Sequence, residues 1–193
     1  MKKVLITGAT ASQTSGEAHK RNPRFAGLLN TSFSFSGVHS EMKSLPIDID
    51  SKDISTYDKV IVGLAPITSL SANKMYTALR SLGLAMEQDK AVVLLDAPDP
   101  STVYQSFNSV LNNPDILKKA LYSKRDGFDA VISDEKLFDS MLSTISKLVD
   151  GAYTVVVPAL PYFSGSRAVY GIPNESFGLV ELNFDGLFFD KHF

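Results

Sequence analysis

The stretch Lys59-Val-Ile-Val-Gly-Leu64 decides the fold, because it is a short apolar run that stops at Ala65-Pro66. A run of this kind between turn signals is typical of a strand buried on both faces of a parallel sheet. Lys3–Thr7, which Gly8 ends, and Ala91–Leu95 have the same character. We therefore predict at least these three parallel strands.

Helical patterns lie between the apolar runs. Ser71 can cap a helix over 72–87, and Ser133 or Asp134 can cap a second helix over 135–149. A shorter helix is expected from Asn113-Pro114 to about Tyr122. The alternation of strands and helices predicts an α/β, Rossmann-like fold over residues 1–160: a doubly wound, mostly parallel sheet with helices on both faces.

Three weaker segments complete the expected sheet. Leu45–Ile49 is expected to be an edge strand because it contains Pro46, and Ala130–Ile132 and Tyr153–Val157 are also predicted strands. Residues 161–193 are rich in aromatic side chains and glycine. We expect an extended tail there, which packs on the domain or leads to a second domain.

The composition excludes several classes of protein. The chain has 193 residues, a formal net charge of −2 and no cysteine. A disulfide scaffold, a thiolate nucleophile and a cysteine zinc site are therefore excluded. The histidines, His19, His39 and His192, are not spaced as metal ligands, so we expect no metal. No apolar run approaches the ~18 residues of a membrane span, and we expect a cytoplasmic protein without a membrane partner.

The expected ligand site is the carboxyl edge of the sheet, where ligands bind in open α/β folds. Three loops follow strands there: 8–22, 65–71 and 96–100. The binding residues that we expect from them are Gly8, Thr10, Ser12, Gln13, Pro66, Ser69 and Asp99. Lys20, Arg21 and Arg24 form either a basic lip that contacts phosphates or a solvated loop.

The segment Val4-Leu-Ile-Thr-Gly-Ala-Thr10 is similar to the start of short-chain dehydrogenases. Those enzymes need further glycines two or three residues apart, so that the backbone can approach a pyrophosphate. The next glycine after Gly8 is Gly16, and no tyrosine has a lysine four positions on. We therefore do not expect NAD(P) binding.

Asp96 is the candidate catalytic residue. It directly follows an apolar strand, where a carboxylate can act as a general base toward an acceptor hydroxyl. The alternative is that Asp96 only forms a turn, since Asp and Pro favour turns. For Asp99 we favour the turn.

The stretches Tyr57–Pro66 (YDKVIVGLAP) and Val92–Pro100 (VVLLDAPDP) resemble strands of the GT-B glycosyltransferases. The resemblance is to the N-terminal, acceptor-binding half, and in particular to bacteriophage enzymes that glycosylate modified bases in DNA. It implies that Asp96 is the catalytic base and that Pro100 matches the family's proline. It also implies a nucleotide-sugar donor of the UDP-sugar type, no tightly bound cofactor, and the host cytoplasm for a phage-encoded protein.

The resemblance covers one half of such an enzyme, because a GT-B fold has two Rossmann-like domains and the second binds the donor. We therefore expect no sugar transfer by this chain alone. A separate donor domain or a homo-oligomer would complete the enzyme. The acceptor is either a modified nucleic-acid base, with Lys20, Arg21 and Arg24 on the DNA phosphates, or another compound with a hydroxyl group.

Two other functions stay open. The first is a binding module that captures a nucleotide or nucleotide sugar without turnover in the same crevice. Its hydroxyl and backbone donors would be Thr7, Gly8, Ser12, Thr14 and Ser69. The second is a structural subunit whose C-terminal phenylalanines pack against a partner: Phe177, Phe184, Phe188, Phe189 and Phe193.

Overall fold

The computed structural model describes residues 2–8, 38–67, 70–95, 100–122, 131, 133–150, 154–157 and 179–181. Its centre is a parallel sheet with the strand order β2-β1-β3-β4-β5-β6. The strands are β1 (Lys3–Gly8), β2 (His39–Met42), β3 (Lys59–Leu64), β4 (Ala91–Leu95), β5 (Thr154–Val157) and β6 (Leu179–Glu181). The α/β class and the parallel sheet are thereby confirmed, and the arrangement is compatible with a Rossmann-like fold.

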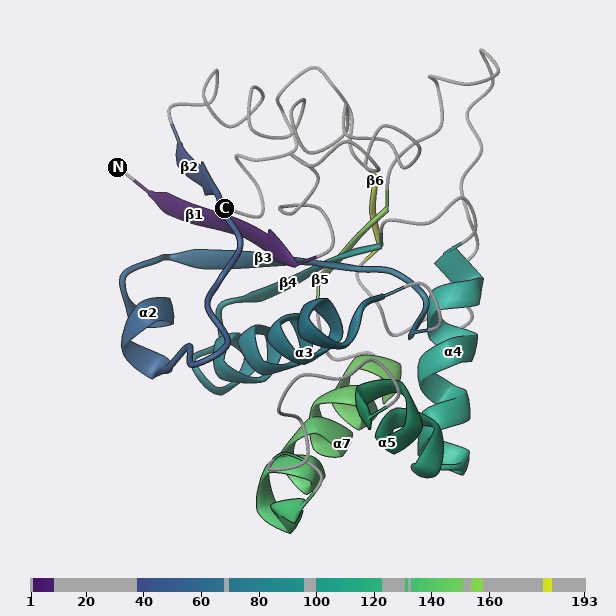
Figure 1. The fold of residues 1–193 in the computed structure, drawn as a ribbon. Helices are drawn as coiled ribbons and strands as arrows, with labels where there is room; N and C mark the ends of the chain where they lie inside the picture. The colour runs from purple at the N-terminus through teal and green to yellow at the C-terminus, as the bar shows by residue number, and fades with distance from the viewer. Residues whose placement is uncertain are drawn as a thin grey trace.

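The helices are α2 (Ser51–Ser55), α3 (Ala72–Glu87), α4 (Pro100–Asn112), α5 (Asp115–Tyr122) and α7 (Glu135–Asp150). All five lie on one side of the sheet, with α3 directly against β1, β3 and β4 (Figure 1). The expectation of helices on the opposite face concerns residues outside those described. No helix in the described ranges is both long and apolar enough to cross a membrane.

Both faces of the central strands are buried, as their continuous apolar sequence predicts. On the helix face, Leu5, Val60, Val62 and Val93 join the core cluster formed with α3, α4, α5 and α7. Their neighbours in the strands point to the other face and are equally buried: Val4, Ile6, Ile61 and Val92. A strand that alternated polar and apolar residues would bury its polar side chains on one of the two covered faces.

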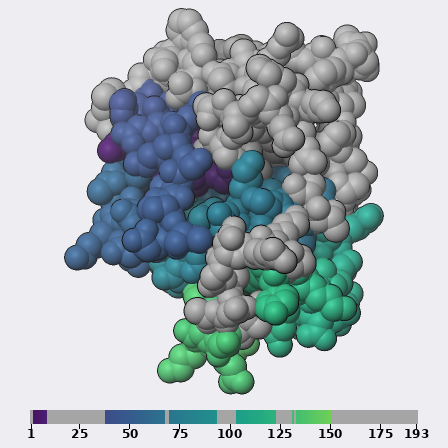
Figure 2. All heavy atoms as spheres, in the orientation of Figure 1, coloured from purple at the N-terminus to yellow at the C-terminus, as the bar shows by residue number. Residues whose placement is uncertain are grey.

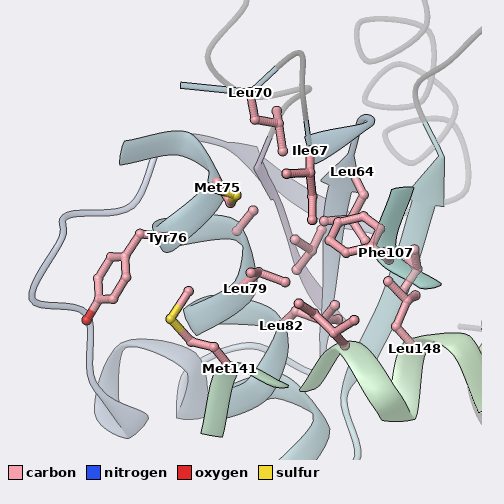
Figure 3. Close-up of a cluster of buried hydrophobic side chains, with 14 of the residues drawn as sticks. Leu64, Ile67, Leu70, Met75, Tyr76, Leu79, Leu82, Phe107, Met141 and Leu148 are labelled. Carbon is pink, nitrogen blue, oxygen red and sulfur yellow. The ribbon is translucent and has the colours of Figure 1, made fainter. Parts of the chain in front are cut away.

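The helix-face core is a continuous layer between the sheet and the helices α3, α4, α5 and α7. Leu79 and Leu82 of α3 lie between β3 and α7, and Phe107 of α4 lies close to Leu64 and Leu148 (Figure 3). Phe107, Leu79 and Leu82 are at most 1% exposed. At ~25 cal/mol per Å² of buried apolar surface, this layer supplies the main force that holds the helices to the sheet.

The predicted helices over 72–87 and 135–149 are confirmed, and each has the expected kind of cap. The Ser71 side chain accepts a hydrogen bond from the Lys74 amide at 3.3 Å. Of the two candidates for the second cap, Asp134 has this role, because its Oδ1 accepts from Lys136 N and Leu137 N. The helix that was expected to end near Tyr122 is α5.

Two predicted strands are wrong. Leu45–Ile49 forms a turn in which the Ile49 amide donates to the Pro46 carbonyl, and the edge strand is His39–Met42 instead. An edge strand with one neighbour needs no apolar pattern, and β2 (HSEM) has none. In the predicted strand Ala130–Ile132, the described residue, Val131, is helical. Three apolar residues are too few to distinguish a strand from a helix.

Residues 161–193, expected to be a tail, include β6, which pairs in parallel with β5. This pairing makes Leu179–Glu181 part of the sheet.

Candidate functional site

The strand order reverses between β1 and β3. After β1 the chain forms β2 on one side of it, and then β3 on the other side. In open parallel sheets, ligands bind outside the carboxyl ends of the strands at such a reversal. The candidate site is therefore the edge where β1 and β3 end.

Two glycines face each other at this edge. Gly8 is the register partner of Gly63, and its φ of +84° is a conformation that side chains disfavour. A Cβ atom at Gly8 would overlap the Gly63 carbonyl oxygen and lie 2.9 Å from the Gly63 nitrogen. Only glycine lets β1 leave the sheet here while it stays in contact with β3.

A cavity of about 240 Å³ lies beside Gly8. Its described walls come from the end of β1, the segment after β2, and the first two turns of α3: Thr7, Gly8, Ser44, Leu45, Ile47, Asn73, Lys74 and Thr77. Among these residues Lys74 alone is ionisable, and none is acidic. In the space-filling view, atoms of β1 are visible between the 38–50 segment and α3 (Figure 2).

The packing of α3 directs its polar residues to the cavity. Met75, Leu79 and Leu82 are buried against the sheet, whereas Asn73 and Lys74 are exposed and Thr77 is half-buried. Helix N-termini carry a partial positive charge, and Lys74 adds a full one. The cavity thus combines neutral hydrogen-bonding side chains with positive charge, which suits an anionic polar ligand.

A second cavity, of about 500 Å³, shares the residues Ser44 and Leu45 with the first. Its other described walls come from β1, β2 and α2 with the residues that follow each strand or helix: Lys3, Glu41, Lys43, Pro46, Lys52, Asp53, Thr56 and Tyr57. The carboxylate of Glu41 is the centre of a charged cluster in its wall.

Glu41 has four polar partners. The Tyr57 hydroxyl donates to its Oε2 at 2.6 Å, while Lys3 and Lys43 Nζ lie 3.4 Å from its carboxylate oxygens and His39 Nε2 lies 3.5 Å away. The two ammonium groups also lie over the Tyr57 ring, 4.8 and 5.3 Å from its centroid. The Tyr57 hydrogen bond, followed by the lysines, lowers the pKa of Glu41 from 4.5 to about 2.

We expect Tyr57→Phe to raise the pKa of Glu41 from about 2 toward 4.5, because the largest stabilising contact of the carboxylate is removed. The folded-state pKa is below the unfolded value, so the cluster stabilises the protein above about pH 4.5 and loses this effect as the pH falls toward 2. An NMR titration of the Glu41 carboxyl carbon in both proteins measures the shift. A wild-type pKa near 4.5 contradicts the account, as does an unchanged pKa in the variant.

Of the binding residues expected from the sequence, the structure describes Gly8 and Pro66. Gly8 lines the first cavity, whereas the half-buried Pro66 follows β3 and lines neither cavity. The other predicted site residues lie outside the described part of the chain: Thr10, Ser12, Gln13, Lys20, Arg21, Arg24, Ser69, Asp96 and Asp99. Thr7, named for the binding-module alternative, is buried and lines the first cavity.

Sequence reasoning missed Ser44, Asn73, Lys74 and Thr77 in the first cavity. The last three stand at the start of the helix that follows β3, which is a signal that could have found them. Ser44 carried no such signal, because the edge strand before it was misplaced.

No group of three or more potential metal ligands (His, Asp or Glu) occurs in the described part of the chain. Comparisons with family models, curated proteins and solved structures find no match to this chain.

Proposed function

We propose that this chain binds a phosphate-bearing small molecule, of the nucleotide or nucleotide-sugar class, at the carboxyl edge of β1 and β3. The observation that carries the proposal is the cavity beside Gly8, with Lys74 as the one ionisable residue among its described walls. The position supports it further, since this is where the strand order reverses. The fold is then a Rossmann-like, doubly wound domain.

The size and chemistry of the cavity narrow the ligand class. Cavities for drug-sized ligands run from about 300 to 1,000 Å³. At about 240 Å³, this one suits a phosphate with an adjoining sugar rather than a complete dinucleotide. The side chains of Thr7, Ser44, Asn73 and Thr77 are suited to sugar hydroxyls and phosphate oxygens.

Calorimetric titration with UMP, UDP and UDP-glucose tests the proposal. We expect Lys74→Met to weaken binding by tenfold or more, because a hydrogen bond to a charged group contributes about 1.5–3 kcal/mol. Lys136→Met is the matched control, since Lys136 is also an exposed lysine in the first turn of a helix, α7. The proposal fails if none of the three compounds binds, or if Lys74→Met binds them as the wild type does.

Glycosyl transfer is the second candidate function, favoured by one observation. β4 ends at Leu95, the register partner of Leu64, at the same edge of the sheet as the cavity. Asp96, the proposed base, is the next residue in the sequence. The same titrations separate the candidates, because an acceptor half of a GT-B enzyme binds the donor weakly. Tight UDP-glucose binding by this chain favours the binding module, whereas weak UDP-glucose binding favours the acceptor half of a transferase.

A further inference from the structure

The second cavity has no role in the function proposed above, although it adjoins the first. Ser44 and Leu45 line both cavities, so a ligand in one reaches the wall of the other. Their volumes of about 240 and 500 Å³ together fall within the range of about 300–1,000 Å³ typical of small-molecule sites. The shared wall suggests that both serve one ligand.

The wall of the second cavity has more ammonium groups than carboxylates. Lys3, Lys43 and Lys52 line it, together with Glu41 and Asp53. Asp53 also closes the capping box of α2, in which its carboxylate accepts from the Asp50 amide at 2.9 Å. Of these two carboxylates, Glu41 is the one that contacts Lys3 and Lys43.

Lys3 and Lys43 are held in place before any ligand arrives. Each ammonium group lies 3.4 Å from a Glu41 oxygen and over the ring of the buried Tyr57. Two cations share one anion, so the group formed by Lys3, Lys43 and Glu41 keeps a net positive charge. Fixing the cations in advance lowers the entropy cost of binding an anion.

We propose that the two cavities form one bipartite site, in which Lys74 holds a first phosphate and Lys43 with Lys3 holds a second, separate anionic group of the same ligand. The ligand class is a small molecule with two separated phosphates, such as a nucleoside bisphosphate. The inference rests on the proposed function, because the first phosphate occupies the cavity beside Gly8.

The test compares adenosine 5′-monophosphate with adenosine 3′,5′-bisphosphate by calorimetry, on the wild type, Lys43→Met, Lys74→Met and the control Lys136→Met. We expect the wild type to bind the bisphosphate at least about tenfold more tightly. Lys43→Met removes that preference and leaves monophosphate affinity unchanged, whereas Lys74→Met weakens both compounds. Thermal unfolding of each variant verifies that it is folded, as expected for exposed lysines.

Other outcomes overturn the inference, and they separate it from the proposed function. Equal wild-type affinity for the two compounds, or an equal loss for both in Lys43→Met, overturns the bipartite site while the first phosphate site stands. Binding of two monophosphates per chain shows two independent anion sites and also overturns it. No binding of either adenosine compound, or no effect of Lys74→Met on their binding, overturns this inference. The proposed function fails with it only if UMP, UDP and UDP-glucose also do not bind, or bind to Lys74→Met as they do to the wild type.

Discussion

Replacement of Gly8 by alanine is expected to lower the free energy of unfolding by about 3 kcal/mol or more. A residue with a side chain costs about 1–2 kcal/mol in the left-handed conformation that Gly8 adopts, at φ +84°. The added methyl group would also overlap the Gly63 carbonyl oxygen. Because the overlapping atom belongs to the backbone of β3, relief requires the two strands to separate. Chemical denaturation of wild type and variant measures the loss.

A contrasting pair of variants tests the reason for this effect. A Cβ at Gly83 of α3 would lie 2.8 Å from Oγ1 of Thr144 on α7, which is a side-chain atom. Adding Thr144→Ala to Gly83→Ala should therefore recover stability, whereas adding Val62→Ala to Gly8→Ala should not. A Gly8→Ala protein as stable as the wild type would contradict the described geometry of the β1–β3 edge.

Replacement of Phe107 by alanine is the second large effect, with an expected loss of about 3–5 kcal/mol. Phe107 is fully buried and comes from α4, and its ring lies close to Leu64 of β3 and Leu148 of α7 (Figure 3). Its removal leaves a cavity where sheet and helices meet, and the rigid strand cannot move in to fill it. Chemical denaturation at constant pH measures the change.

Asn108→Ala is the matched control for Phe107→Ala. Asn108 is the next residue of the same helix and is exposed, so its truncation should change stability by less than about 0.5 kcal/mol. Equal effects of the two substitutions would mean that α4 does not pack on the sheet through Phe107.

Three of the strands predicted from the sequence, β1, β3 and β4, have buried residues on both faces. β3 and β4 were predicted with their observed bounds, because burial on both faces requires an unbroken apolar run. The edge strand β2 could not be found this way, since its residues are exposed or half-buried. Its place in the sheet depends on pairing with β1, which leaves no local pattern.

The sequence of α4 has a helical pattern, although no helix was predicted there. Pro100 begins it, and Val103, Phe107 and Val110 recur at helical spacing with 0% exposure. The Asp and Pro residues before it favoured a turn and hid this pattern. The short α2 was also missed, although Asp50 and Asp53 form a capping box at its start.

The position of the candidate cavity could be predicted from the sequence, but most of the residues that line it could not. The rule for parallel sheets indicated the carboxyl edge, and Gly8 followed from it directly. Lys74 and Ser44 line the same cavity because of the rotation of α3 about its own axis and the path of the chain after β2. Those features depend on tertiary packing, which a one-dimensional pattern does not specify.

Amide chemical-shift mapping shows whether a phosphate-bearing ligand binds beside Gly8. Unlabelled UDP is titrated into the ¹⁵N-labelled chain. We expect saturable shifts of the amides of Gly8, Ser44 and Lys74, with those of Asp134 to Lys136 at the start of α7 unchanged. Binding beside Gly8 is contradicted if no amide signal shifts in a saturable way. It is also contradicted if other amide signals shift but those of Gly8, Ser44 and Lys74 do not.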